Sequence, residues 1–243
     1  FSIAKKLIRL AFDTAVDAHK DQRRKSGEAY VFHPIGVAKI VASQIGLDAT
    51  SISAALLHDV IEDTKYSLDD LNKLFGSRVT KIVEGLTKIS NLKKETEISL
   101  QAENFRKMLL TLNEDIRVII IKIADRLHNM QTLDSMPEHK QIKTASETLY
   151  IYAPIAHRIG MYNIKTELED LSLKYTDNKS FNDIKSKIDD SKEEQEQYIK
   201  NFSKLIETTL NKERLKYFVQ GRSKSIYSIH LKMQNKNISF EKV

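Results

Sequence analysis

Four ionisable side chains lie close together in the sequence, at His58-Asp59 and Glu62-Asp63. On a helix, His58 and Glu62 would share one face, while Asp59 and Asp63 would share a neighbouring face about 100° away. The apolar range 54–57 comes directly before them, so these side chains are expected at the edge of a buried pocket. Imidazole and carboxylate groups that are held rigidly at such an edge can bind a divalent ion.

Two residues elsewhere in the chain could complete a metal site. His33 precedes a proline at the predicted start of a helix, and Asp125 opens the string Asp-Arg-Leu-His-Asn. With His58 and Asp59 they make a set of two imidazoles and two carboxylates, which suits Mn²⁺, Fe²⁺ or Zn²⁺. Composition and spacing leave the choice of ion open. An isolated His-Asp pair is usually a helix cap or a surface pair, so the metal hypothesis depends on all four residues together.

The composition limits the classes of protein to which the chain can belong. The 243 residues contain no cysteine, which excludes a disulfide framework, a thiolate metal site and a cysteine nucleophile. Lys and Arg number 39 against 33 Asp and Glu, a net charge of +6 that favours phosphate-bearing partners without separating nucleic acid from nucleotide. The longest apolar run, at 118–124, is interrupted by Lys122 and is far too short to span a bilayer. We therefore expect a soluble, cytoplasmic protein, and a chain that starts at Phe1 is expected to be cut from a longer one.

Helices are expected to position these side chains, because seven glycines and three prolines are few breakers for this length. Apolar spacing predicts one helix ending near His19, one from Pro34 to Gly46 and one from Ile52 to about Asp63. Asp48 or Thr50 can cap the third of these helices. Further helices are predicted at 67–76, 78–89 and 102–112, with a mobile or frayed segment at 91–97, and proline starts at 137 and 154. The β-branched run 118–121 fits a buried strand or a buried helix.

Three parts are predicted along the chain. Residues 1–175 are expected to be mainly α, and 176–215 form a charged helical connector. Residues 216–243 then read as the truncated start of a second domain, with a short strand at 216–219, a helix from Ile226 to Met233 and a further strand at 238–240.

The ordered motifs resemble one family, the HD superfamily of metal-dependent phosphohydrolases, and within it the long Rel/SpoT enzymes that make and degrade (p)ppGpp. The matching strings cover nearly the whole chain: 24–27 (Arg-Lys-Ser-Gly), 30–34 (Tyr-Val-Phe-His-Pro), 58–64 (His-Asp-Val-Ile-Glu-Asp-Thr), 124–132, 151–160, 167–171 and 221–228 (Gly-Arg-Ser-Lys-Ser-Ile-Tyr-Ser). The resemblance implies a mainly α HD hydrolase domain, followed by a helical connector and the first α/β elements of a nucleotidyl-transferase-like synthetase domain.

The resemblance also implies a reaction, in which the 3′-pyrophosphate of (p)ppGpp is removed to leave GDP or GTP during stringent-response control. It implies one Mn²⁺ held by His33, His58, Asp59 and Asp125. We hypothesise that Glu62 and Asp63 orient or deprotonate the attacking water.

Substrate contacts are implied for two segments. The loop residues Arg24, Lys25 and Ser26 match the guanine-nucleotide site, with Arg24 suited to stacking on the base. Asn129 and Thr132 follow Asp125 by one and almost two helical turns, so both could meet ribose or base. His128 and His157 are expected to support the fold or the ligands rather than to bind the ion.

A second nucleotide site is implied only in part. The set resembling the ATP-phosphate site of the synthetase is Arg222, Lys224, Ser228 and Lys232. Its acidic metal-binding residues would lie beyond Val243, so synthetase activity is expected only of the full-length chain. Ribosome contact is expected only through regions outside this sequence, and neither membrane association nor direct nucleic-acid binding is expected of it.

Two alternatives remain at this point. The first is an HD hydrolase of another nucleotide, against which the match at Arg24-Lys25-Ser26 argues. The second is a silent regulatory domain that binds an alarmone, against which the intact ligand set and the Glu62-Asp63 pair argue.

Overall fold

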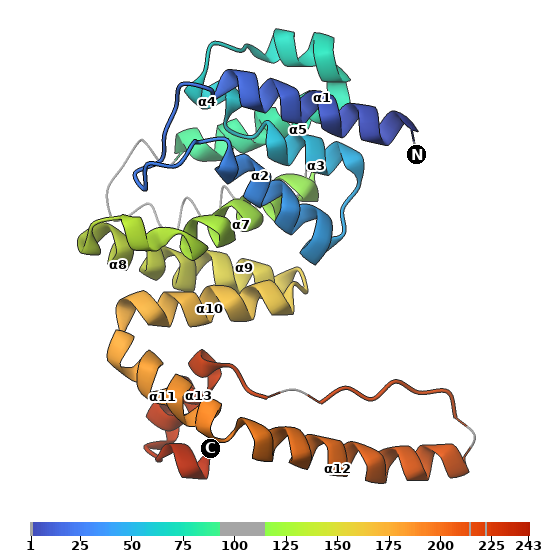
Figure 1. Cartoon of the computed structure of the whole chain (residues 1–243), viewed down its shortest axis with the longest axis vertical. Coiled ribbons are helices and arrows are strands. Elements are labelled where there is room, and N and C mark those ends of the chain that lie inside the picture. The colour runs from blue at the N-terminus through green and yellow to red at the C-terminus, as the bar shows by residue number, and fades with distance from the viewer. Residues whose placement is uncertain (1, 93–114, 214, 222) are drawn as a thin grey trace. The chain divides into compact units, whose positions relative to one another are not determined.

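Helices make up every regular element among residues 2–92, 115–213, 215–221 and 223–243, which the computed structural model describes (Figure 1). The chain divides into two compact units, Phe1–Leu168 and Glu169–Val243. The predicted mainly α fold is confirmed, whereas the three-part division at 175 and 215 stays a prediction. No helix in the described ranges is both long and apolar enough to cross a membrane.

The first unit is a series of short and medium helices (Figure 1). In chain order they are α1 (Ser2–Ala18), α2 (Phe32–Lys39), the π-helix η1 (Ile40–Ile45), α3 (Ala49–Leu56), α4 (Val60–Asp63), α5 (Leu68–Leu92), α7 (Ile116–Gln131), the 3₁₀-helix η2 (Leu133–Ser135), α8 (Glu138–Glu147), the π-helix η3 (Thr148–Tyr152), α9 (Ala153–Arg158) and α10 (Tyr162–Thr176). The last of these crosses the boundary between the units.

Helix α3 is the centre of the core. It packs against α1, α2, α5 and α7, and Ala54 and Ala55, which are fully buried, let the neighbouring helices approach closely. Its first turn is capped by Asp48, whose carboxylate accepts a hydrogen bond from the backbone N–H of Ser51 at 3.0 Å. This cap, one of the two predicted, fixes the start of the helix that leads into His58.

The helix predicted from Ile52 to Asp63 is broken, so that prediction was wrong. Residues 57–59 form a turn between α3 and α4, with φ/ψ of −104°/3° at Leu57 and −99°/−5° at Asp59. The imidazole Nδ1 of His58 lies 2.7 Å from the carbonyl oxygen of Ala55. In a continuous α-helix that carbonyl would accept the N–H of Asp59, so the side-chain bond competes with the helical one.

Helix α7 resolves the ambiguous β-branched run as a buried helix. Asp115 caps it by accepting a hydrogen bond from the backbone N–H of Arg117 at 3.0 Å. Ile119, Ile121 and Ile123 are fully buried, and α2, α3 and α5 all contact the helix. This packing explains why the run lacks the polar face that would have identified it as a helix in the sequence.

Helix α5 begins with a capping box. The backbone N–H of Ser67 donates to the Asp70 carboxylate at 3.0 Å, and the N–H of Asp70 donates to the Ser67 hydroxyl at 3.2 Å. At Gly76 the backbone turns to φ 75° and ψ 171°, which interrupts the helix where an end was predicted. The predicted helix 102–112 and residues 93–97 of the segment 91–97 lie outside the described residues, while 91–92 belong to α5.

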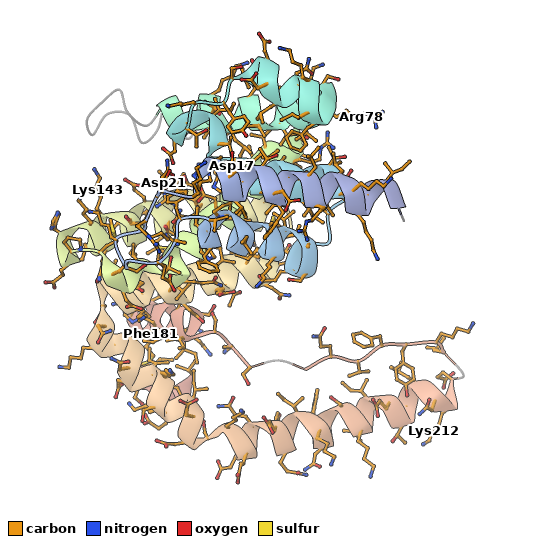
Figure 2. The ribbon with its side chains drawn as sticks, turned by 45° about the horizontal axis from the view of Figure 1, so that its top comes forward. Asp17, Asp21, Arg78, Lys143, Phe181 and Lys212 are labelled. Atoms are coloured by element: carbon orange, nitrogen blue, oxygen red, sulfur yellow. The ribbon has the colours of Figure 1, made fainter. Side chains whose placement is uncertain are left out.

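The second unit contains α11 (Asn178–Asp190), α12 (Lys192–Lys212), α13 (Ile226–Lys236) and the 3₁₀-helix η4 (Phe240–Lys242). Helix α11 packs against both α12 and α13. None of the residues of α12 is buried, and its side chains project along its length up to Lys212 (Figure 2). The strands predicted at 216–219 and 238–240 are not formed, so that prediction was wrong. A strand needs a neighbouring strand to pair its backbone, and the described residues provide none.

Candidate metal centre

His58 is held in one orientation at the end of α3. Its side chain is only 1% exposed. Because the Ala55 carbonyl can only accept a hydrogen bond, Nδ1 of His58 carries a proton, and Nε2 is the nitrogen that could bind a metal ion. This buried Nε2 has no hydrogen bond of good geometry among the described residues. It lies 3.0 Å from Asp59 Oδ2 and 3.9 Å from Asp125 Oδ1.

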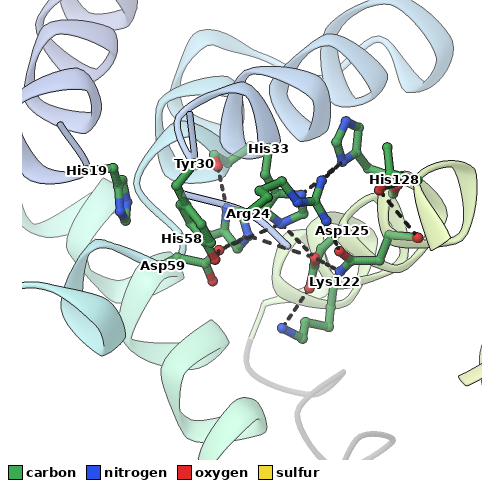
Figure 3. A network of polar contacts seen from close by, with 12 residues as sticks. His19, Arg24, Tyr30, His33, His58, Asp59, Lys122, Asp125 and His128 are labelled. Carbon is green, nitrogen blue, oxygen red and sulfur yellow. Dashed lines mark hydrogen bonds and ion pairs between the residues drawn. The ribbon is translucent and has the colours of Figure 1, made fainter. Parts of the chain in front are cut away.

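His33 approaches the same point from α2. It lies in the first turn of that helix, directly before Pro34, and is buried. Its Nε2 is 3.2 Å from Asp125 Oδ1 and 3.7 Å from Asp59 Oδ2. The rings of His33 and His58 meet edge to face with centroids 5.2 Å apart. Figure 3 shows the two imidazoles and two carboxylates converging.

Asp125 comes from the buried side of α7. Its Oδ2 is paired with the ammonium group of Lys122 at 2.8 Å, and its Oδ1 accepts a hydrogen bond from Asn129 Nδ2 at 2.6 Å. Burial by itself would raise the pKa of Asp125, but Lys122 and the imidazoles of His33 and His58 hold this pKa well below its usual range. Asp125 is therefore a carboxylate anion inside the protein.

The electrostatics of the cluster favour a cation. Burial by itself would lower the pKa of His58, but the carboxylates of Asp59 and Asp125 outweigh burial and raise this pKa to about 9. Burial by itself would raise the pKa of Asp59, but the imidazoles of His58 and His33 keep it well below its usual value. The buried anions thus attract positive charge to the point between the two histidines.

The donor atoms fit a metal ion. One nitrogen each of His33 and His58 and one oxygen of Asp125 all lie within 4.8 Å of one another. Asp59 Oδ2 lies beside both imidazoles. Two imidazoles with carboxylates are donors that borderline divalent ions accept, and the unpaired Nε2 of His58 gains a partner when an ion binds there. The structure thus has a possible His/His/Asp metal site.

Two supporting residues were missed in the sequence. The phenol of Tyr30 donates a hydrogen bond to Asp59 Oδ2 at 2.8 Å, and burial together with Asp59 raises the pKa of Tyr30, which keeps the proton on the phenol. Lys122 forms the ion pair with Asp125 from one helical turn earlier. In the sequence, Lys122 stands out as the one charged residue within an apolar run, whereas no local pattern pairs Tyr30 with Asp59.

The basic loop before α2 reaches the same helix. Arg24 Nη2 donates to Asn129 Oδ1 at 3.0 Å, and Arg24 Nη1 lies 3.5 Å from His128 Nδ1. Its neighbours Lys25 and Ser26 are exposed. Of the three predicted loop residues, the structure therefore brings only Arg24 into contact with the cluster's own helix.

The other predicted site residues are placed differently. The hydroxyl of Thr132 donates to the His128 carbonyl at 2.9 Å and Thr132 ends α7, so it is engaged with its own helix. Glu62 is partly buried and Asp63 is exposed on α4. The Asp63 carbonyl accepts a hydrogen bond from Gln22 Nε2 at 2.7 Å. Because α4 starts after the break, the single helix that was expected to relate these acids to His58 is not formed, although the backbone N–H of Asp63 bonds to the Asp59 carbonyl at 3.0 Å.

The residues matched to a synthetase site belong to the second unit. Lys224 and Lys232 both donate to the carbonyl oxygen of Val243, the former at 3.1 Å. Ser228 lies in the first turn of α13, where its hydroxyl is 2.8 Å from that of Ser225. Arg222 lies outside the described residues. The role of this set stays a prediction.

The first unit is helical and brings two buried histidines and two carboxylates to one point, which is a possible metal site. A family model described as HD domain matches residues 11–162. The chain therefore belongs to the HD domain family. All four proposed ligands lie inside the matched range.

Curated relatives extend the similarity over nearly the whole chain. The GTP pyrophosphokinase of Myxococcus xanthus is 45% identical over 240 residues, which cover 98% of this chain and 32% of the relative. The bifunctional (p)ppGpp synthase/hydrolase SpoT of Escherichia coli strain K12 is 43% identical over 238 residues, 98% of this chain and 34% of the relative. The chain thus spans about a third of these relatives.

Two further comparisons agree. The guanosine-3′,5′-bis(diphosphate) 3′-pyrophosphohydrolase of Aquifex aeolicus is 42% identical over 240 residues, 97% of this chain and 34% of the relative. A solved structure of a metazoan SpoT orthologue described as hydrolysing ppGpp matches with a TM-score of 0.52 and 26% identity, covering 68% of this chain and 93% of that one. These matches confirm the resemblance to the Rel/SpoT enzymes.

Proposed function

We propose that this chain hydrolyses the 3′-pyrophosphate of (p)ppGpp to give GDP or GTP and pyrophosphate, using one Mn²⁺. The observation that carries the proposal is the convergence of two imidazole nitrogens and two carboxylates on one buried point. The names of the relatives support the substrate, because several of them are 3′-pyrophosphohydrolases of guanosine-3′,5′-bis(diphosphate).

His33, His58, Asp59 and Asp125 would hold the ion. A bound divalent ion lowers the pKa of water and neutralises charge that develops on phosphate oxygens. The chain's own contribution is to keep the ligands in place: Tyr30 orients Asp59 and Lys122 orients Asp125. Tyr30 bonds to Asp59 Oδ2, the oxygen that lies beside both imidazoles. Lys122 pairs with Asp125 Oδ2, while Asp125 Oδ1 lies beside His33.

Glu62 and Asp63 on α4 would orient the attacking water or accept its proton. The backbone N–H groups of Glu62 and Asp63 donate hydrogen bonds to the Asp59 carbonyl at 3.1 and 3.0 Å. The short helix α4 therefore starts at Asp59, one of the proposed ligands. A carboxylate near a cation can accept a proton from water. We assign this role to Glu62 in the first place, since it is partly buried and Asp63 is exposed.

The guanine nucleotide would bind at the basic loop. Arg24 has the flat cationic group that stacks on a base, while Lys25 and Ser26 are exposed and could contact phosphate or ribose. Asn129, which contacts both Arg24 and Asp125, would lie between nucleotide and ion. Thr132 is the weakest of these candidates because its hydroxyl bonds to its own helix.

The whole protein would be a cytoplasmic enzyme of stringent-response control with synthetase activity in addition. Arg222, Lys224, Ser228 and Lys232 would contribute to binding ATP phosphates in that longer protein. The name of the Myxococcus relative, a GTP pyrophosphokinase, supports this part of the proposal.

Release of labelled pyrophosphate from 3′-labelled ppGpp, with and without Mn²⁺, tests the hydrolase directly. We expect release that depends on Mn²⁺ and is lost in His58→Ala but kept in His139→Ala, because His139 is an exposed histidine of α8. Release without added or residual metal, or release retained in His58→Ala, would contradict the proposal. Turnover of GTP but not ppGpp would instead indicate a hydrolase of another nucleotide.

A further inference from the structure

His128 lies inside the cluster although it is not one of the proposed ligands. Its Nδ1 is 2.9 Å from Nδ1 of His33, and the two ring centroids are 4.9 Å apart. Arg24 Nη1 lies 3.5 Å from the same nitrogen of His128. Figure 3 shows His128 on the far side of His33 from His58. The ring therefore contacts a ligand on the edge that faces away from the ion.

The partners of His128 determine where the shared proton lies. Two imidazole nitrogens 2.9 Å apart form a hydrogen bond with one proton between them, which either ring could supply. An arginine side chain can only donate, so the Arg24 guanidinium favours a lone pair on His128 Nδ1. With an ion bound between His33 Nε2 and Asp125 Oδ1, which lie 3.2 Å apart, the shared proton would therefore belong to Nδ1 of His33, and Nε2 would offer its lone pair to the ion.

The backbone of α2 provides the space for this ring. A Cβ atom on Gly36 would come within 2.1 Å of His128 Nε2 and 2.2 Å of its Cδ2. Any side chain at position 36 would thus push the imidazole out of its place. A glycine inside a helix destabilises it relative to alanine, and the close approach of the His128 ring is a physical reason for a glycine at this position, one turn after His33.

We propose that His128 is a positioning residue. It accepts a hydrogen bond from the Nδ1–H of His33 and so fixes the tautomer and the ring plane that present His33 Nε2 to the ion. Gly36 supplies the space and Arg24 sets the direction of the hydrogen bond. This inference rests on the proposed metal-dependent function. The arrangement proposed for His33 is the same as the one seen at His58, where the Ala55 carbonyl accepts a hydrogen bond from Nδ1–H.

The first test measures Mn²⁺ affinity of the whole chain from the paramagnetic resonance signal of free Mn²⁺. His128→Leu removes the acceptor and His128→Asn, of similar size, offers an amide oxygen near the position of Nδ1. Loss of a group that orients a metal ligand typically lowers affinity about 10- to 100-fold. We expect this loss in the Leu variant and recovery of most of the affinity in the Asn variant. Equal affinity of the two variants would overturn the inference.

The second test uses the contact with Gly36. Gly36→Ala should weaken Mn²⁺ binding in the wild-type background and have no further effect in His128→Ala, since the ring it displaces is then absent. Equal effects of Gly36→Ala in both backgrounds would overturn the role of the ring. If the wild-type chain binds no Mn²⁺ and releases no pyrophosphate, the proposed function itself fails. Wild-type binding with unaffected His128 variants overturns only this inference.

Discussion

The chemistry of the site depends on the imbalance between acceptors and donors around one buried point. The Nε2 atoms of both His33 and His58 face carboxylate oxygens of Asp59 and Asp125. Buried anions are costly unless they are paired with positive charge. Lys122 pairs with Oδ2 of Asp125. Asp125 Oδ1 and Asp59 Oδ2 face the imidazoles, where an ion could bind.

Replacement of Lys122 by Met should destabilise the chain when divalent ions are removed by a chelator. The substitution leaves Asp125 buried without its ammonium partner, and breaking a buried ion pair in this way costs about 3–5 kcal/mol. The free energy of unfolding from urea titrations measures this loss. Lys143→Met, on the exposed side of α8, is the matched control and should change little (Figure 2). Equal stabilities of the two variants would refute the structural role of the pair.

Replacement of Glu62 by Gln should abolish pyrophosphate release while the chain still binds Mn²⁺. The amide keeps the size of the side chain but cannot accept the proton of the water in the way a carboxylate does. Loss of general base catalysis typically lowers turnover about 10²- to 10⁴-fold. The turnover number and the metal content of the purified variant are the two measurements. Asp63→Asn, on the exposed neighbour, should have the smaller effect.

The result for Glu62 separates its role from that of the ligands. A variant that loses both turnover and Mn²⁺ would place Glu62 among the groups that hold the ion. A variant with wild-type turnover would remove Glu62 from the mechanism and leave the ligand set intact.

At the scale of elements, three segments position the proposed ligands: the first turn of α2, the break between α3 and α4, and the middle of α7. The sequence predicted the helices well because apolar spacing, the Asp48 cap and the Ser67-Asp70 box are local signals. From residue types and their order it singled out four candidate ligands, an assignment that stays a prediction. The convergence of those ligands needed the packed structure.

The missed features depend on contacts between distant residues. The break at His58 follows from a side-chain bond to the Ala55 carbonyl, which competes with a helix that the pattern alone favours. Tyr30 and Asp59 are 29 residues apart. The fit of His128 against Gly36 likewise exists only after α2 packs on α7. No periodicity or cap encodes such pairs.

Replacement of Asp48 by Ala should lower the stability of the helix that leads into the metal centre. The carboxylate satisfies the free N–H of Ser51, and loss of an N-cap costs about 1 kcal/mol. For a chain of this size that corresponds to a fall in Tm of about 2–4 °C. Thermal unfolding followed by circular dichroism measures it. Asp48→Asn keeps an acceptor at the cap and should retain most of the stability; an equal fall in both variants would argue for a charge effect instead.

At the scale of the whole molecule, the described contacts of the metal centre belong to one unit. His33, His58, Asp59, Asp125 and their partners Tyr30, Lys122 and His128 all precede Leu168. The second unit contributes its own helices and the set matched to a synthetase. The two chemical roles proposed for the longer protein are therefore assigned to separate parts of the chain.

A shortened chain ending at Thr176 should bind Mn²⁺ as the whole chain does. The end is placed after α10 because this helix crosses the unit boundary, and Ile164 and Leu168 bury their side chains on it. Changes remote from a site usually leave its energetics nearly unaltered, so we expect dissociation constants within about twofold of each other. The same shortened chain with His58→Ala is the control for specific binding. A folded fragment that binds Mn²⁺ ten times more weakly, on the order of 1.4 kcal/mol, would mean that residues of the second unit support the metal centre after all.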